Sequence, residues 1–176
     1  MSIDARLAEL GITLPAAAAP VAAYVPAVEV NGLLHISGQI ALKDGQLMTG
    51  RLGEDRDLDY GVEAARACGL NLIAQMKAAL GGDLDRVERI VKLGAFIASA
   101  PGFTDQPKVI NGASDFMVAV LGEAGRHARS AVSAASLPAR CKTPLPISPA
   151  IASSGKNNST PSPIIWKNRN RRRVNK

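Results

Sequence analysis

Hydrophobic residues recur at helical spacing in three stretches of the chain. The pattern over residues 3–10 predicts a short helix that ends at Gly11. The longest pattern predicts a helix over residues 57–80, with an aspartate at its start as the N-cap and Gly81-Gly82 as its stop. The predicted buried side of that helix holds Ala65, Cys68, Leu72, Met76 and Ala79.

A third helical pattern begins after residue 103, where Thr104 or Asp105 can serve as the N-cap. Its apolar stripe is long and regular, which predicts a helix packed against a core. The predicted buried positions are Val109, Ala113, Phe116, Met117, Val120 and Leu121.

Between the helical patterns lie runs that are typical of β-strands. Residues 24–30 and 33–42 form two such runs, and Asn31-Gly32 between them is a strong hairpin signal. A third run over residues 46–52 follows Lys43-Asp44-Gly45, which has turn chemistry. These runs predict antiparallel pairing near the N-terminus.

Two further strands are predicted, one before and one after the third helix. Residues 86–99 carry apolar residues on both faces, so we expect part of this strand to be covered on both sides. Residues 129–135 form a shorter run. The order β-β-β-α-β-α-β predicts an α+β fold, with two helices on one face of a mixed sheet.

The character of the chain changes after Pro138. Residues 139–176 contain five prolines, clusters of serine and asparagine and a final basic run, and show neither strand nor helix periodicity. We therefore predict one domain over residues 1–138 and a disordered tail over residues 139–176. The abrupt change resembles the result of a reading-frame change or a fusion.

Charge supports the same division. The chain carries a net charge of +6, but all 15 acidic residues precede Pro138, so the predicted domain carries −3 and the tail +9. A basic tail could bind RNA or an acidic surface through its charge. Trp166 is its single aromatic residue, which gives little support for specific nucleic-acid recognition.

Neither a membrane segment nor a metal site is predicted. The apolar stretch at residues 16–23 is interrupted by Pro20 and is too short to span a bilayer. The two cysteines, Cys68 and Cys141, lack the spacing of metal ligands or of a disulfide framework. A cytoplasmic protein is the default expectation.

Arg129 is the main candidate for ligand binding, because it stands where the third helix gives way to a strand. A guanidinium there could hold a carboxylate through two parallel hydrogen bonds. The alternative is an ordinary surface arginine, solvated or paired with an acid. His35 and His127 have no partner at catalytic spacing, so both are predicted to be structural.

Four segments of the chain together resemble one known family. They are Tyr24-Val25-Pro26-Ala27-Val28, His35-Ile36-Ser37-Gly38-Gln39, Val109-Ile110-Asn111-Gly112-Ala113 and Arg129-Ser130-Ala131-Val132. In order and spacing they resemble the RidA (YjgF/YER057c/UK114) family, and within it the endoribonuclease L-PSP-like branch. The resemblance covers roughly residues 5–138.

This resemblance implies a chorismate-mutase-like α+β fold, a homotrimer and ligand sites in the clefts between subunits. Family members hydrolyse reactive enamines and imines, such as 2-aminoacrylate, to a keto acid and ammonia without a metal or organic cofactor. By the resemblance, Arg129 would hold the substrate carboxylate. Tyr24, Ser37 and Asn111 would line the same cleft, and Gly38 would allow close approach to the backbone.

The chain departs from the family pattern at two places. Ala131 stands where many relatives have a cysteine. After Leu137-Pro138 the family has a final strand with a glutamate thought to position the attacking water, and Pro144 falls about where that glutamate would lie. The last family strand is therefore predicted to be missing, and no catalytic residue is assigned.

Structural roles remain open for the other candidate residues. Tyr24 could belong to the core or to the hairpin, Ser37 could satisfy backbone groups at a bend, and Asn111 could be an exposed helix residue. Cys68 is predicted to be a small buried hydrophobe. Three functions follow, in order of preference: an imine deaminase, a non-catalytic trimer that binds small carboxylates, and an RNA-binding or ribonuclease-like protein.

Overall fold

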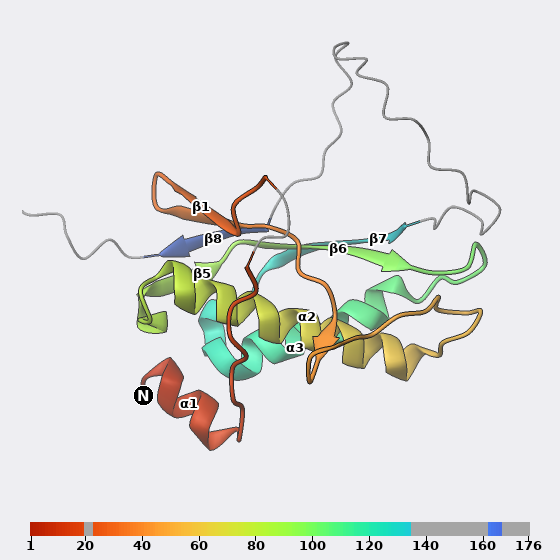
Figure 1. Ribbon diagram of the computed structural model, residues 1–176, viewed down its shortest axis with the longest axis horizontal. Helices are drawn as coiled ribbons and strands as arrows, with labels where there is room; N and C mark the ends of the chain where they lie inside the picture. The colour runs from red at the N-terminus through yellow and green to blue at the C-terminus, as the bar shows by residue number, and fades with distance from the viewer. Residues whose placement is uncertain (20–22, 135–161, 167–176) are drawn as a thin grey trace, which may run out of the picture.

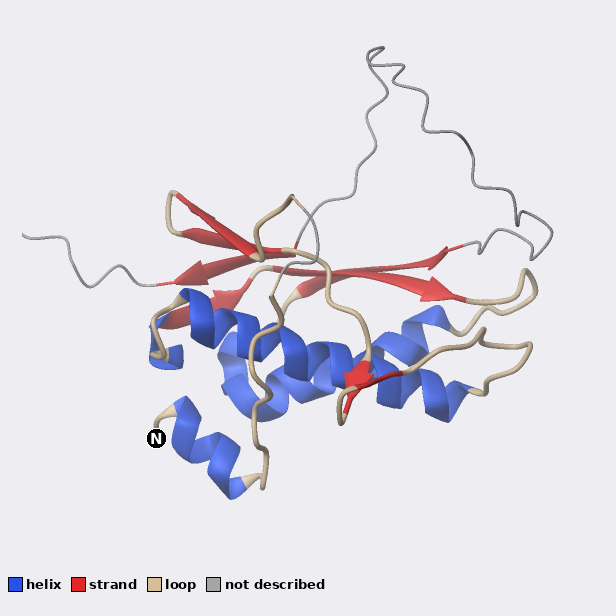
Figure 2. Ribbon diagram, in the orientation of Figure 1, coloured by secondary structure: helices blue, strands red, loops and turns tan. Residues whose placement is uncertain are grey.

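The computed structural model describes residues 1–19, 23–134 and 162–166. Its longer strands form one layer, the helices cover one face of that layer, and a short hairpin over residues 42–47 lies beside the helices (Figures 1 and 2). The elements in chain order are α1 (Ile3–Glu9), β1 (Ala27–Val30), β2 (Leu33–Ile36), β3 (Leu42–Lys43), β4 (Gln46–Leu47), α2 (Leu58–Ala79), the 3₁₀ helix η1 (Leu84–Arg86), β5 (Val87–Ile90), β6 (Lys92–Ala98), α3 (Gln106–Leu121), the 3₁₀ helix η2 (Gly122–Gly125), β7 (Ala128–Ala134) and β8 (Ser162–Trp166).

The predicted α+β class is confirmed, and the described strands include both antiparallel and parallel pairs. Strands β1, β2, β8 and β5 are hydrogen-bonded in that order as antiparallel neighbours. Val91 alone separates β5 from β6, and β6 pairs with β7 in parallel, with Leu93 opposite Arg129. Helices α2 and α3 run side by side beneath these strands (Figure 1).

Both predicted turns have the backbone that the sequence requires. Asn31 and Gly32 lie at φ of 53° and 79°, and Asp44 and Gly45 at 51° and 76°. Two successive residues of positive φ form the tight hairpin turn that suits the twist of antiparallel strands. The strands themselves are shorter than predicted: β1 begins at Ala27, and β3 and β4 have two residues each.

The helix limits follow their capping residues. The Asp57 carboxylate accepts a hydrogen bond from the Tyr60 N–H at 2.8 Å at the start of α2. At the start of α3, Asp105 holds the N-cap position without a side-chain cap. Pro107 has no N–H to offer there, and the Asp105 carboxylate pairs instead with Lys108 at 3.0 Å.

The core lies between the sheet and the two long helices. All six predicted positions of α3 are buried, including Phe116 and Met117 at 2% and 0% exposure. In α2 the prediction is partly wrong: Ala65 and Met76 are buried, Cys68 and Leu72 are half-buried, and Ala79 is exposed. A Cβ on Gly112 would lie 2.0 Å from the Val62 carbonyl oxygen, so the two helices pack very closely at this point.

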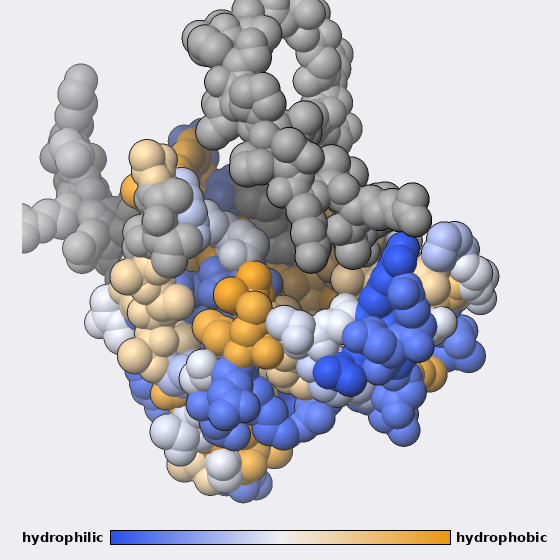
Figure 3. Space-filling view, turned by 45° about the vertical axis from the view of Figure 1, so that its right-hand side comes forward, coloured by the Kyte–Doolittle hydropathy of each residue, from blue (hydrophilic) through white to orange (hydrophobic). Residues whose placement is uncertain are grey.

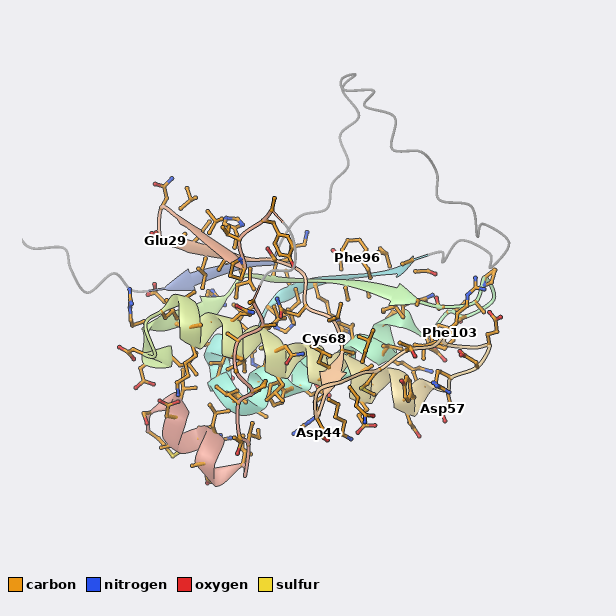
Figure 4. The ribbon with its side chains drawn as sticks, viewed as in Figure 1. Glu29, Asp44, Asp57, Cys68, Phe96 and Phe103 are labelled. Atoms are coloured by element: carbon orange, nitrogen blue, oxygen red, sulfur yellow. The ribbon has the colours of Figure 1, made fainter. Side chains whose placement is uncertain are left out.

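The predicted strand over residues 86–99 is divided by Val91, and this break changes which side chains face inward. Val87 and Ile90 are both buried, because the pairing register shifts between Val87 and Arg89. Phe96 is 66% exposed, so the strand is not covered on both sides at this residue. Phe96 lies on the side of the sheet away from α2 and α3 (Figure 4).

Five residues of the tail that was predicted to be disordered form a strand. The backbone of Ser162–Trp166 forms β8, which lies between β2 and β5, so a strand follows Pro138 after all. Proline is normally excluded from such an inner position because it lacks an N–H. Pro163 lies opposite His35 of β2 but beyond the end of β5, whose pairing stops at Ile90 and Ile164, so it interrupts one ladder at most. The other tail residues lie outside the described residues.

None of the helices in the described part of the chain combines the length and the apolar character needed to cross a membrane.

Candidate functional site

Arg129 lies near the start of β7 and points toward the helices. Side chains alternate between the two faces of a strand, and Ala131 packs against the apolar cluster between sheet and helices. Arg129 therefore belongs to the same face. Its side chain is exposed. From this position it reaches α3.

Three neutral oxygens of α3 hold the guanidinium of Arg129. Nη1 donates to the Asn111 side-chain oxygen at 2.7 Å and to the Ser114 hydroxyl at 3.2 Å. Nη2 donates to the Pro107 carbonyl oxygen at 3.2 Å. The first turns of α3 thus fix the arginine from one side.

No carboxylate among the described residues pairs with Arg129. A guanidinium has five N–H donors, and the three hydrogen bonds leave the Nε–H and one Nη2–H for another acceptor. Nε and Nη2 are neighbours on one edge of the group, and an arginine binds carboxylates through pairs of adjacent N–H donors. The arrangement is therefore suited to binding an external anion.

Ser114 and His127 extend this group of residues. The Ser114 hydroxyl lies 3.1 Å from Nε2 of His127, and Nδ1 of His127 lies 2.6 Å from the Gly125 carbonyl oxygen. The sequence offered no partner for His127 at catalytic spacing, and the structure brings it into contact with Ser114; its predicted structural role stays a prediction. Sequence spacing missed the pair because Ser114 lies in α3 and His127 follows η2, where only the turn between helix and strand brings them together.

Ser37 and Tyr24 belong to a separate group of contacts, which joins the segment before β1 to the residue after β2. The Ser37 hydroxyl donates to the Val25 carbonyl oxygen at 2.7 Å, and its N–H donates to the Pro26 carbonyl oxygen at 2.9 Å. Ser37 thus holds the segment that carries Tyr24, which is 48% exposed and not a core residue. Gly38 has open space where a Cβ would stand, so nothing among the described residues requires a glycine there.

A hollow in the described part of the molecule lies between β6, α2 and the segment after β2. Its volume is about 770 Å³, and apolar side chains dominate its wall. Ser37 and Gly38 line it, whereas Arg129, Asn111 and Tyr24 do not. Apolar surface beside a strongly hydrophilic region is visible on one face of the molecule (Figure 3).

Cys68 belongs to the wall of this hollow, below the sheet (Figure 4). Burial raises the pKa of its thiol to about 11, because the charged thiolate is poorly solvated there. A thiol with so high a pKa is almost fully protonated at neutral pH and is a weak nucleophile. The predicted structural role of Cys68 is consistent with this environment.

The candidate residues therefore fall into two groups within one chain. Arg129 and Asn111 are in direct contact, together with Ser114, which the sequence did not single out, and Ser114 contacts His127, which was predicted to be structural. Ser37, Gly38 and the Tyr24 segment form the second group. No hydrogen bond between described residues joins the two groups, so their predicted sharing of one cleft stays a prediction.

Comparison with known proteins gives close relatives that cover most of the chain. Protein TCP17 of Trypanosoma cruzi is 54% identical over 138 residues, which are 77% of this chain and 86% of that protein. A protein of unknown function from Agrobacterium tumefaciens is 48% identical, with a TM-score of 0.70 over 78% of this chain and 85% of its own. A "putative endoribonuclease" from Shewanella oneidensis is 35% identical, with a TM-score of 0.74 over 78% and 91% of the two chains.

The family comparison agrees with these relatives. Residues 4–143 match the sequence model of the family described as "YjgF/chorismate_mutase-like, putative endoribonuclease". This range contains all four sequence segments that carried the resemblance, and the arrangement of helices on one face of a mixed sheet is the fold of these relatives. The chain belongs to the RidA/YjgF family, in its endoribonuclease L-PSP-like branch.

Proposed function

We propose that the protein hydrolyses reactive imines or enamines that carry a carboxylate, of the 2-aminoacrylate type. The observation that carries this proposal is the state of Arg129. Its guanidinium is held by three neutral oxygens and has no acidic partner among the described residues. A fixed cation of this kind binds and orients a small carboxylate.

Hydrolysis of an imine requires few other groups from the protein. The carbon of an imine is already electrophilic, so water can add to it, and the resulting carbinolamine loses ammonia to give a keto acid. Arg129 would hold the carboxylate next to the reacting carbon and so fix which atom the water meets. Proton transfers to and from water and nitrogen need a general acid or base, which we do not assign to a residue.

A homotrimer, with the site completed between subunits, is part of this proposal. The face of the sheet away from the helices exposes Phe96 at 66%, Val30 at 49%, and Val28 and Val132 at 47% each. Exposed apolar residues on a sheet face are typical of surfaces that bind another protein. A second copy there could bring its Ser37 and Tyr24 segment close to Arg129.

The proposal is tested by measuring ammonia release from an imine generated in solution from an amino acid. The wild-type chain should accelerate the release, and Arg129→Ala should lose most of the acceleration. Arg126→Ala is the matched control, because Arg126 is an exposed neighbour that pairs with Glu123 at 2.9 Å and should not affect the rate. Equal rates for wild type and Arg129→Ala would reject the catalytic role.

Two other functions are separated by further measurements. A non-catalytic carboxylate-binding protein would bind pyruvate through Arg129 without accelerating hydrolysis. An RNA-directed activity is favoured by the description of the family and by the basic residues after Pro138. It predicts RNA affinity that falls steeply with salt and that is lost when Arg171, Arg172 and Arg173, which follow β8, are replaced by glutamine.

A further inference from the structure

Ser114 and His127 are conspicuous because neither has a role in the function proposed above. Both lie close to Arg129, and together they form a continuous series of hydrogen bonds from Gly125 to the guanidinium. We propose that Ser114 and His127 are positioning residues that hold Arg129 in its carboxylate-binding orientation. This inference rests on the proposed function, in which the orientation of Arg129 matters because the arginine binds the substrate carboxylate.

The direction of each hydrogen bond follows from the chemistry of its partners. A carbonyl oxygen can only accept, so Nδ1 of His127 must carry the hydrogen that it shares with Gly125. In the neutral ring, Nε2 is then an acceptor. The Ser114 hydroxyl therefore donates its hydrogen to Nε2, and its lone pairs remain for Nη1 of Arg129.

His127 thus decides what Ser114 can do. A free serine hydroxyl can donate to or accept from many neighbours, but this one has its hydrogen committed to Nε2. The Arg129 guanidinium can only donate hydrogen bonds. The Ser114 oxygen, whose own hydrogen is committed to His127, is therefore left to accept one from it. The two residues consequently act on the ligand through Arg129 and need not touch it.

The Gly125 carbonyl, at the end of the series farthest from Arg129, is fixed by packing. Gly125 is buried, and a Cβ there would lie 2.3 Å from the Met117 carbonyl oxygen, so the turn packs directly on the backbone of α3. The acceptor for His127 is therefore part of the packed junction between α3 and η2. Asn111 and Pro107, one and two turns before Ser114, hold the same guanidinium from a rigid helix.

Fixing the guanidinium should matter for binding. Two-pronged recognition of a carboxylate requires both donors to lie in its plane, and a mobile arginine loses conformational freedom when it binds. Removing the Ser114 hydroxyl should weaken binding of the carboxylate. A threonine at this position, which keeps the hydroxyl, should restore it. Because the effect concerns orientation of the carboxylate holder, KM for the imine should rise more than kcat falls.

The test uses the full-length chain and four variants: Ser114→Ala, Ser114→Thr, His127→Phe and Ser130→Ala. Nitrogen-15 NMR without ligand reports the tautomer of His127 and the Arg129 guanidinium signals, and pyruvate is the binding probe. We expect an Nδ1–H tautomer, and pyruvate affinity about tenfold weaker in Ser114→Ala and His127→Phe. Ser114→Thr and the control Ser130→Ala should bind as wild type does.

Two results would overturn the inference: an Nε2–H tautomer of His127, or a folded Ser114→Ala chain with unchanged Arg129 signals and unchanged pyruvate affinity. Failure of the proposed function looks different. In that case pyruvate fails to bind the wild-type chain or imine hydrolysis is not accelerated. The ligand-free spectra would then decide the positioning role alone, by showing whether the Arg129 signals depend on Ser114.

Discussion

Nη1 of Arg129 lies 2.7 Å from the side-chain oxygen of Asn111, although 18 residues separate them in the chain. This contact joins the edge strand β7 to the second turn of α3 and fixes the arginine with a neutral partner. A neutral oxygen holds the guanidinium in place without cancelling its charge, unlike a carboxylate. The site therefore keeps both its orientation and its attraction for anions.

The charge of the partner at position 111 can be tested directly. Asn111→Asp places a carboxylate against the guanidinium and should reduce pyruvate affinity by competing with the ligand, whereas Asn111→Ala removes only one holding contact. We expect binding to Asn111→Asp to be about tenfold weaker than to Asn111→Ala, or about 1.4 kcal/mol. Isothermal titration of pyruvate measures both, and a stronger-binding aspartate variant would contradict the account.

A second prediction concerns the close contact of the long helices. Gly112→Ala should destabilise the protein by about 1–3 kcal/mol, because the added methyl meets the Val62 carbonyl oxygen at 2.0 Å and must push the helices apart. Helix propensity alone favours alanine by about 1 kcal/mol, so the sign of the effect is informative. Urea unfolding measures it.

The control for that measurement is Gly102→Ala, where no atom lies within 4 Å of the added methyl. We expect its free energy of unfolding to stay within about 0.5 kcal/mol of the wild type, as is usual for surface substitutions. Equal stability of the two variants would show that α2 and α3 are not packed as closely as described.

The outer face of the sheet gives a third prediction. Phe96→Glu should convert the expected trimer to a monomer, because the charge would have to be buried in a subunit contact. Native mass spectrometry and sedimentation both report the mass. A wild-type monomer, or a Phe96→Glu trimer, would show that this face does not join subunits.

The Cys68 thiol predicts a pH dependence of stability. Its pKa is raised to about 11 in the folded chain, whereas an unfolded cysteine ionises near pH 8.5. Between these values the unfolded state loses the proton first, so the free energy of unfolding should fall as pH rises, by up to about 1.4 kcal/mol per unit.

This effect is isolated by comparing the wild type with Cys68→Ala. Urea unfolding at pH 8 and pH 10 should show a larger decrease for the wild type, by about 1–2 kcal/mol. If both proteins lose the same stability, other groups are responsible and the thiol is not held in an apolar environment.

Local patterns predicted the parts of the fold that local physics determines. Asn31-Gly32 forms its turn because both residues tolerate positive φ, and all six predicted positions on α3 are buried because a regular stripe can face only one way. The irregularity between Val87 and Arg89 was missed, because a register shift depends on the partner strand rather than on the run itself.

Long-range pairing was beyond these patterns. β8 pairs with β2 and β5, which lie more than 70 residues earlier in the chain, and its short sequence shows no periodicity of its own. At the candidate site, Arg129 was singled out by its place between helix and strand, and Asn111 through the family resemblance. The contact between Ser114 and His127 was missed because one residue on a helix and one after a turn form no sequence motif.

The central claim is that Arg129 binds the carboxylate of an imine substrate during hydrolysis. The most direct measurement compares kcat/KM for a carboxylated imine and its carboxamide analogue, in the wild-type chain and in Arg129→Ala. Replacing the carboxylate by a carboxamide should lower kcat/KM in both proteins. The account predicts that the decrease is at least tenfold larger in the wild type than in Arg129→Ala, a coupling of about 1.4 kcal/mol or more. An identical ratio in both proteins would show that the arginine and the carboxylate do not interact, and would contradict the account.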